Sequence, residues 1–341
     1  MIVFSVNLPK IAGKGEDANP LAEIYENGSG VTVVFDGLGG SGSTKYELDG
    51  NVFTGAWFAS RLVKCAIAVW FRNLAALPGF DPAEHMKQLE NGLRELLRHA
   101  AGKLDHTPSK LRSNLIRRLP TTLSGVYFRF ENGRYLAWTL NAGDSRTYFL
   151  TPQSGLQILT EDDEVGPPKD ALLSLYGDGR ISNCLDADSE FKITVKKYDL
   201  PAGIFVSASD GCFDYVKFPA QFEYFLLDTM MRSGSVDEWK VNFLNEFKTF
   251  AGDDVSIALI SREMKDIGEM KAAFAERHEL LAQKYVQPID AMEWKVIESE
   301  GNDNGISSAR NELRKTLWEE YRKDYEILMS EEPKPIPNAE R

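Results

Sequence analysis

The feature that most constrains the fold is an aspartate repeated at the edges of short apolar runs. The four runs are VTVVF before Asp36, WTLNAG before Asp144, IFVSAS before Asp210 and VSIALI after Asp254. Aspartate is a poor strand residue, and a single Asp-Gly pair indicates no more than a turn. The repetition favours a second interpretation, in which several strand ends bring carboxylates into one small region.

Carboxylates gathered in one region cannot all ionise unaided, and a divalent cation with hard oxygen ligands resolves the conflict. A further acidic pair, Glu16-Asp17, precedes the first apolar run, and glycine follows both Asp36 and Asp210. A glycine lets a backbone carbonyl approach an ion. Two such cations about 3.5–4 Å apart can activate water for in-line displacement at phosphorus. The pattern therefore predicts metal-dependent hydrolysis of phosphate esters.

Strand-like runs and helical blocks occur in separate groups, which favours an α+β fold with mainly antiparallel sheets. Strands are predicted at Val31–Phe35, Ser124–Phe130, Tyr135–Asn141, Arg146–Leu150, Phe191–Lys197, Ile204–Ala208 and Val255–Ile260. Two helical blocks are predicted among the first ~260 residues, at Thr54–Ala76 and Pro82–Lys103, from their apolar periodicity. Asn132-Gly133 between the second and third strands is typical of a hairpin turn.

The character of the chain changes after Ser261. Charged helical segments are predicted at Glu263–Gln287, ended by Pro288, and at Ser308–Met329, capped by Ser307 or Ser308. Residues 1–260 are therefore predicted to form one domain and residues 261–341 a helical extension. The terminal sequence EEPKPIPNAER is predicted to be disordered.

Two interpretations of the extension stay open. Its helices either pack back onto the first domain or remain solvated, or they form a dimer or partner contact. In the second case Trp294, Trp318 and Tyr321 would be the anchors, because aromatic residues carry much of the energy of interfaces.

Composition excludes several classes of protein. The net charge of -12 argues against general binding to nucleic acid, which requires a basic surface. There is no run of 18 apolar residues and no signal sequence, so we expect a cytoplasmic protein that does not enter a membrane. The three cysteines are far apart, and none of the four histidines pairs with one at zinc spacing.

The stretch Gly37–Gly42 contains G-x-G-x-x-G after a predicted strand, which is the spacing of a dinucleotide-binding loop. A helix should follow such a loop at once, but Glu47–Asn51 intervenes. The expected acidic residue about 20 positions further on is also missing, as is a P-loop lysine. We therefore reject nucleotide binding at this loop.

Seven segments, taken in order, resemble motifs of the protein phosphatase 2C family of metal-dependent Ser/Thr protein phosphatases, in its bacterial form. They are GEDA (15–18), VFDGLGG (34–40), TTL (121–123), AGDSR (142–146), LTED (159–162), SASDG (207–211) and GDDVS (252–256). Each segment is weak alone, but their order over residues 13–260 is specific. The resemblance implies a β-sandwich of two mainly antiparallel sheets flanked by helix pairs, with a metal site at one end.

The resemblance also implies roles for single residues. The central ligands would be Asp36, bridging both metals, the Gly37 carbonyl on the second metal, and Asp210 and Asp253 on the first. The others would be Glu16 and Asp17 near the metal waters, Asp144 and Asp214 on a third metal, and Asp254 in support. Asp36, Asp210 and Asp253 are thus the predicted catalytic residues, and the predicted cofactors are two or three Mn2+ or Mg2+ ions.

Two positions depart from the family pattern. Ala12 stands where many members have an arginine that grips the substrate phosphate, and Leu38 stands where some have a histidine proposed as general acid. Lys14, or else Lys10, could replace the arginine, although a lysine offers a point charge rather than a bidentate fork.

The resemblance implies a signalling enzyme that removes phosphate from phosphoserine and phosphothreonine on proteins. Its partners would be phosphoprotein substrates and a cognate Ser/Thr kinase, and the C-terminal helices could form a homo-oligomer. The alternative is a catalytically weak phosphatase-fold adaptor that acts through its helical tail.

Overall fold

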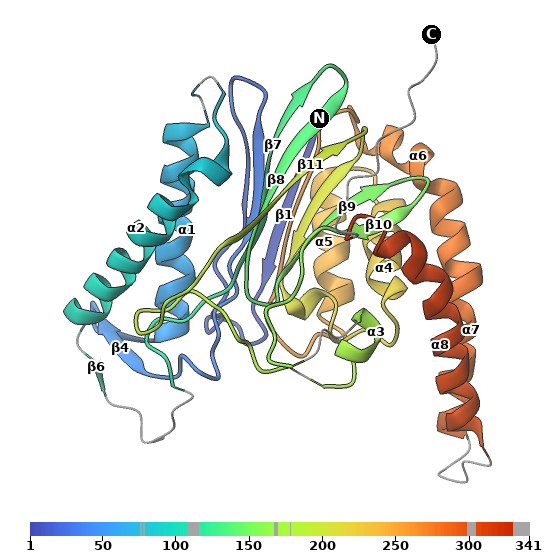
Figure 1. The fold of residues 1–341 in the computed structure, drawn as a ribbon. Coiled ribbons are helices and arrows are strands. Elements are labelled where there is room, and N and C mark those ends of the chain that lie inside the picture. The colour runs from blue at the N-terminus through green and yellow to red at the C-terminus, as the bar shows by residue number, and fades with distance from the viewer. Residues whose placement is uncertain are drawn as a thin grey trace.

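The computed structural model describes residues 1–75, 77, 79–104, 106–107, 116–166, 170–177, 179–298 and 305–329. Two five-stranded sheets pack against each other, and helices cover both outer faces (Figure 1). All named strand pairs are antiparallel, so the predicted α+β sandwich is confirmed. The terminal EEPKPIPNAER segment lies outside the described residues.

The first sheet has the strand order β1-β13-β12-β9-β10. Its members are β1 (Ile2–Leu8), β9 (Arg146–Thr151), β10 (Gly155–Ile158), β12 (Ile204–Ala208) and β13 (Val255–Ser261). The central strands β12 and β13 are buried on both faces and therefore read as continuous apolar runs. The prediction did not include β1, although its alternating burial follows an apolar-polar alternation in IVFSVNL.

The second sheet has the order β11-β8-β7-β3-β2. Its members are β2 (Leu21–Ile24), β3 (Gly30–Val34), β7 (Leu123–Glu131), β8 (Arg134–Ala142) and β11 (Thr194–Leu200). Asn132 and Gly133 have φ values of 53° and 77°, which confirms the predicted two-residue hairpin turn. The strand predicted at Phe191–Lys197 begins three residues later, because the N–H groups of Lys192 and Ile193 donate to the side chains of Asn183 and Glu90 and not to a neighbouring strand.

The two sheets meet in an aromatic core. Phe128 of β7 stacks on Phe205 of β12, with ring centroids 4.9 Å apart, and Phe149 of β9 lies beside them. Buried hydroxyl groups also join the sheets, since the Thr32 and Ser207 oxygens are 2.9 Å apart. This packing holds the loops at the ends of both sheets in one arrangement.

A helix pair covers each outer face. On the second sheet lie α1 (Gly55–Leu74) and α2 (Pro82–Lys103), which confirms both predicted helical blocks. On the first sheet lie α4 (Ala220–Met231) and α5 (Val236–Phe247), which the prediction of only two helical blocks before residue 260 missed. Short elements complete the domain: β4 (Lys45–Leu48), β5 (Asn51–Thr54), β6 (His106–Thr107) and α3 (Ala171–Ser174).

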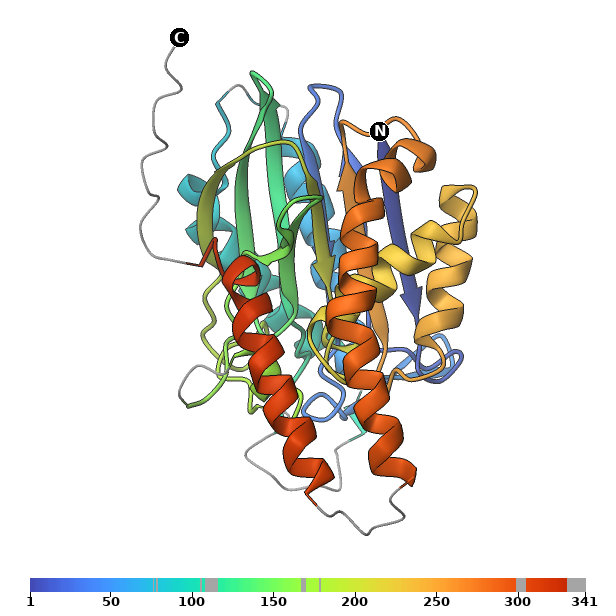
Figure 2. The same cartoon turned by 90° about the vertical axis from the view of Figure 1, so that its right-hand side faces the viewer.

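The C-terminal helices pack onto the first sheet and α4. They are α6 (Ile267–Leu280), a π turn (Leu281–Val286), α7 (Gln287–Glu298) and α8 (Ile306–Tyr325). Figure 2 shows α7 and α8 lying side by side. The division into residues 1–260 and 261–341 stays a prediction, although both parts contribute to one hydrophobic cluster.

A buried polar contact ties these helices together. Glu223 of α4 accepts hydrogen bonds from the Arg277 guanidinium of α6, at 2.7 and 2.9 Å, and from the Tyr321 hydroxyl of α8, at 2.8 Å. Trp318 and Tyr321 are both buried in the cluster that α8 shares with the first sheet, as expected if the helices pack back onto the first domain, so these two residues are not available as interface anchors. Trp294, on α7, is 65% exposed.

Two predicted helix boundaries are wrong. Pro288 does not end a helix, because the preceding π turn widens the backbone where the proline lacks an N–H and its ring needs room. Neither Ser307 nor Ser308 caps α8, because the helix begins one residue before Ser307. Gly305 occupies the cap position with φ 81°, a conformation that glycine adopts easily.

Candidate functional site

The predicted carboxylates lie where strands of both sheets end. Asp36 is two residues beyond β3, Asp210 two residues beyond β12, and Asp144 lies in the connection from β8 to β9. The remaining acidic residues of the predicted site lie in the connections before β2 and β13 and after β12. The antiparallel sandwich therefore brings together acidic residues that are more than 200 positions apart in the sequence.

The main chain of Asp36 is fixed by the Thr121-Thr122 pair. The Thr121 hydroxyl donates to the Asp36 carbonyl at 2.7 Å, and the Thr122 N–H donates to the same carbonyl at 2.8 Å. The Asp36 N–H in turn donates to the Thr122 hydroxyl at 3.2 Å. These bonds explain why TTL belongs to the motif set, since it positions the backbone of the central aspartate.

Mutual repulsion shows that the carboxylates share one region. Burial, followed by the charges of Asp210, Asp17 and Asp144, raises the pKa of Asp36 well above its usual value. Burial and the charges of Asp144, Asp214, Asp253 and Asp17 do the same to the pKa of Asp210. Such a group is unstable as a set of free anions, and a divalent cation would relieve the repulsion.

Two further carboxylates have pKa values near neutrality. Burial and the charge of Asp254 raise the pKa of Asp17 to about 7. Burial, with the charges of Asp162 and Asp214, raises the pKa of Asp144 to about 7. With pKa values this close to neutrality, both side chains could be kept ionised at neutral pH by a bound cation.

The residues fit a hard cation in their chemistry. All the side-chain donors are carboxylate oxygens, which Mg2+ and Mn2+ prefer. Within the described ranges, the buried oxygens Asp17 Oδ2 and Asp144 Oδ1 have no hydrogen-bond partner. The same ranges hold no three Asp, Glu, His or Cys side chains already arranged as a metal cage. Cation binding would therefore draw together carboxylates that repel one another without it.

The loop carrying Glu16 and Asp17 is held by Asp254. The Asp254 carboxylate accepts hydrogen bonds from the N–H groups of Lys10 at 2.7 Å, Glu16 at 2.6 Å and Asp17 at 3.2 Å. Its neighbour Asp253 is exposed and accepts from the Asp254 N–H at 2.8 Å. This arrangement supports the assignment of Asp253 as ligand and Asp254 as support, which stays a prediction.

The glycines after Asp36 allow close packing against the same loop. A Cβ added at Gly37 would lie 2.5 Å from the Glu16 carbonyl oxygen, and one at Gly39 only 1.6 Å from Glu16 Oε2. Contact with Glu16 therefore accounts for the first two glycines of the G-x-G-x-x-G stretch, whereas the third, Gly42, packs against Pro120 and Ala56. Lys10 and Lys14 are both exposed beside this loop, and a phosphate-binding role for Lys14 stays a prediction.

Helix α1 contributes residues that the sequence reasoning missed. The Thr54 hydroxyl, which caps α1 by accepting from the Trp57 N–H at 3.2 Å, donates to the Glu16 carboxylate. Ser60 and Arg61, in the second turn, donate to backbone carbonyls of the same loop. The one available signal was Thr54 as a helix cap, and nothing local linked α1 to a loop about 40 residues earlier.

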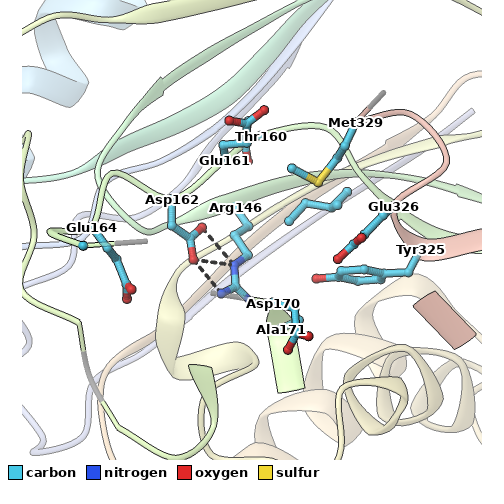
Figure 3. Close-up of a pocket in the computed structure, with 12 residues that line it drawn as sticks. Arg146, Thr160, Glu161, Asp162, Glu164, Asp170, Ala171, Tyr325, Glu326 and Met329 are labelled. Carbon is cyan, nitrogen blue, oxygen red and sulfur yellow. Dashed lines mark hydrogen bonds and ion pairs between the residues drawn. The ribbon is translucent and has the colours of Figure 1, made fainter. Parts of the chain in front are cut away.

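A cavity of about 180 Å3 adjoins the carboxylates and is shown in Figure 3. Arg146 forms one wall and makes a bidentate ion pair with Asp162, with a shortest distance of 2.6 Å. These two residues also line the small pocket that contains Asp144, Asp210 and Asp214. Tyr325 and Met329 form the opposite wall, so the C-terminal segment reaches the edge of the acidic site.

The raised pKa values predict a protein that loses stability as pH rises when cations are absent. A carboxyl with a pKa near 4 unfolded and about 7 folded stabilises the fold at low pH, and that contribution disappears as pH rises to about 7. The loss between pH 5 and pH 8 should be about 2–3 kcal/mol for each such carboxyl. Thermal unfolding in EDTA should show it.

The control is the same experiment with Mn2+ at pH 8, where binding to the native state should restore the midpoint. A midpoint in EDTA that stays constant or rises from pH 5 to pH 8 would contradict the burial of a repulsive carboxylate cluster.

Comparison with solved structures identifies proteins of the same fold. The S. agalactiae serine/threonine phosphatase has a TM-score of 0.53 and 13% identity, and the match covers 77% of this chain and 99% of that protein's chain. Stp1 from Staphylococcus aureus has a TM-score of 0.51 and 15% identity, and the match covers 77% of this chain and 96% of that protein's chain. The Mycobacterium tuberculosis serine/threonine phosphatase PstP/Ppp has a TM-score of 0.50 and 19% identity, and the match covers 77% of this chain and 98% of that protein's chain.

No protein-family model matches the sequence, and no curated protein sequence matches it. The structural likeness nevertheless confirms the resemblance at the level of the fold, which is that of the protein phosphatase 2C-type Ser/Thr phosphatases. In the ranges that the structure describes, no helix combines the length and apolarity needed to cross a bilayer.

Proposed function

We propose that this protein hydrolyses phosphoserine and phosphothreonine esters on proteins with the help of divalent cations. The observation that carries the proposal is the convergence of Asp17, Asp36, Asp144 and Asp210 at one end of a phosphatase-type sandwich. The proposed ligand set is Asp36, the Gly37 carbonyl, Asp210, Asp253, Glu16, Asp17, Asp144 and Asp214.

Mn2+ or Mg2+ bound here would supply Lewis-acid activation of water and neutralise charge on the phosphoryl group. Asp36 and Asp210 would hold the ions from strand ends fixed in the sandwich, so that little reorganisation accompanies the reaction. Thr121 and Thr122 would keep the Asp36 backbone in place. Gly37 and Gly39 would let the Glu16 loop approach closely enough to share the site.

Substrate recognition would differ from that of many family members, because Ala12 and Leu38 replace an arginine and a histidine. Lys14, exposed beside the acidic loop, is the proposed phosphate contact. A lysine provides one point charge, so we expect weaker binding of the phosphate than with an arginine fork. Phosphoproteins, with a cognate Ser/Thr kinase as their source, are the proposed partners.

The deciding experiment measures hydrolysis of 4-nitrophenyl phosphate and of phosphoserine and phosphothreonine peptides. Activity should require Mn2+ or Mg2+, vanish in EDTA and return on adding excess cation, because in the proposed reaction the nucleophile is a water that the cations activate. Cation uptake should be measured separately by calorimetry.

Protein that binds Mn2+ but hydrolyses none of these substrates would favour the alternative, a phosphatase-fold adaptor. Protein that binds no cation would contradict the proposed site itself. The absence of the phosphate-gripping arginine at Ala12 is the observation that keeps the adaptor in consideration.

A further inference from the structure

Arg61, on α1, lies directly behind the loop that carries Glu16 and Asp17. Its guanidinium donates hydrogen bonds to three successive carbonyls of that loop, those of Gly15 at 3.2 Å, Glu16 at 3.1 Å and Asp17 at 3.1 Å. An arginine offers five N–H donors in a rigid planar fork, whereas a lysine has three donors on a single nitrogen atom and lacks that fixed spread.

The guanidinium is itself held in place. Trp57, one turn earlier on α1, lies under it, with the Arg61 Cζ 4.2 Å from the ring centroid. Trp57 stacks in turn on Phe53, with ring centroids 3.9 Å apart. A cation over an aromatic face is attracted by the ring and loses side-chain freedom. Arg61 is therefore oriented before any ligand binds.

The loop is thus clamped from two sides. Asp254 accepts from the N–H groups of Glu16 and Asp17, whereas Arg61 donates to the carbonyls. The Ser60 hydroxyl adds a second bond to the Glu16 carbonyl, at 2.5 Å. Because both N–H and C=O groups are held by distant parts of the chain, the backbone that carries the two acidic side chains is held in one position.

Arg61 also brings positive charge to an acidic region. Burial raises the pKa of Glu16, the Thr54 hydroxyl lowers it, the charges of Asp254 and Asp253 raise it, and the Arg61 charge lowers it. A half-buried guanidinium at this point offsets part of the repulsion among the carboxylates without competing for their oxygens, since its hydrogen bonds go to carbonyls.

We propose that Arg61 is a positioning residue for cation binding, which fixes the Glu16-Asp17 loop against Asp36 and Asp210. This inference rests on the proposed function, because it assigns Arg61 a role in the same site. Arg61 acts through the loop and touches neither the cation nor the substrate.

The test compares Mn2+ affinity, measured by calorimetry on chelator-treated protein, between the wild type and Arg61→Lys. Lysine keeps the charge but loses the fork, so the dissociation constant should rise about tenfold, the loss typical of a residue that orients metal ligands. Ser60→Ala removes one bond to the Glu16 carbonyl and should raise it about threefold.

The matched control is Arg262→Lys. Arg262 also lies over an aromatic ring, that of Phe130 at 5.0 Å, and donates to a loop carbonyl, that of Gly28. Gly28 lies before β3, whereas Asp36 follows the opposite end of that strand. Arg262→Lys should leave Mn2+ affinity unchanged, because the same chemistry is lost away from the site.

A second measurement separates positioning from general damage to the fold. In hydrolysis assays the apparent Mn2+ constant of Arg61→Lys should rise, while kcat at saturating Mn2+ stays within about twofold of the wild type. A residue with a merely structural role would lower the active fraction at every Mn2+ concentration and leave the Mn2+ constant unchanged.

Wild-type Mn2+ affinity in Arg61→Lys and in Ser60→Ala would overturn the inference and leave the proposed function standing. Absence of Mn2+ binding by the wild type would overturn both. If Arg61→Lys fails to fold in chelator, Ser60→Ala decides, since loss of a single hydroxyl preserves the packing of α1.

Discussion

Asp36→Asn is expected to abolish hydrolysis of 4-nitrophenyl phosphate while making the cation-free protein more stable. Loss of the central carboxylate should reduce kcat/KM by about 10³-fold, which corresponds to about 4 kcal/mol of lost charge stabilisation. In EDTA at pH 8 the same change removes one of several mutually repelling buried carboxylates, so the thermal midpoint should rise. The two effects have opposite signs, and simple unfolding would produce only the first.

A suitable control is Asp199→Asn. Asp199 pairs with Arg134 at 2.6 Å at the start of β8, whereas Asp144 follows the other end of that strand. This exposed ion pair should contribute little, so turnover should stay within about twofold and stability within about 0.5 kcal/mol. Near wild-type turnover in Asp36→Asn would show that Asp36 is not a ligand.

The second large effect concerns the C-terminal helices. Trp318→Ala should lower the free energy of unfolding by about 3–5 kcal/mol, because it empties a large volume inside the core that α8 shares with the first sheet. Chemical unfolding monitored by circular dichroism would measure it. The result would show that α8 is a structural part of the phosphatase-type fold in this protein.

Trp294→Ala provides the matched comparison. The same substitution on the neighbouring helix α7 removes a side chain that is 65% exposed, so its effect on unfolding should stay within about 0.5 kcal/mol. Equal, small effects of the two substitutions would mean that α8 does not pack in solution as it does here. A change of oligomeric state in Trp294→Ala alone would favour α7 as the self-association surface.

The sequence predicted those parts of the fold that depend on local patterns. Continuous apolar runs located β3, β12 and β13, and Asn132-Gly133 located the β7–β8 hairpin. Helix α5 was missed although Ser235 and Glu238 have the spacing of a capping box. Ser235 accepts from the Glu238 N–H, and the Glu238 carboxylate accepts from the N–H of Gly234, one residue before the cap. The helix end predicted at Pro288 was wrong because a π turn accommodates the proline, and no local sequence pattern indicates a π turn.

The candidate site likewise has residues that local patterns locate and contacts that only the folded structure reveals. The order of aspartates beside glycines and strand ends is a local property, and it was sufficient to single out Asp36, Asp144, Asp210 and the Asp253-Asp254 pair. Asp214 and the role of each ligand were implied only by the family resemblance. Which of Asp253 and Asp254 holds the Glu16 loop depends on a hydrogen bond across about 240 positions, so only the folded structure could decide it. Arg61 was missed for the same reason, since its partners belong to a different loop.

The sequence by itself thus determined the strand-end carboxylates and the α+β class with mainly antiparallel sheets, because strand periodicity and turn chemistry are encoded within a few neighbouring residues. The packing of two sheets as a sandwich was implied only by the family resemblance. The tertiary structure alone decided that these carboxylates share one buried region, that Arg61 and Asp254 clamp the Glu16-Asp17 loop between them, and that Trp318 is core while Trp294 is surface. The physical reason is that sheet order and helix docking bring together distant segments, and only that packing sets burial, electrostatic repulsion and the pairing of backbone groups.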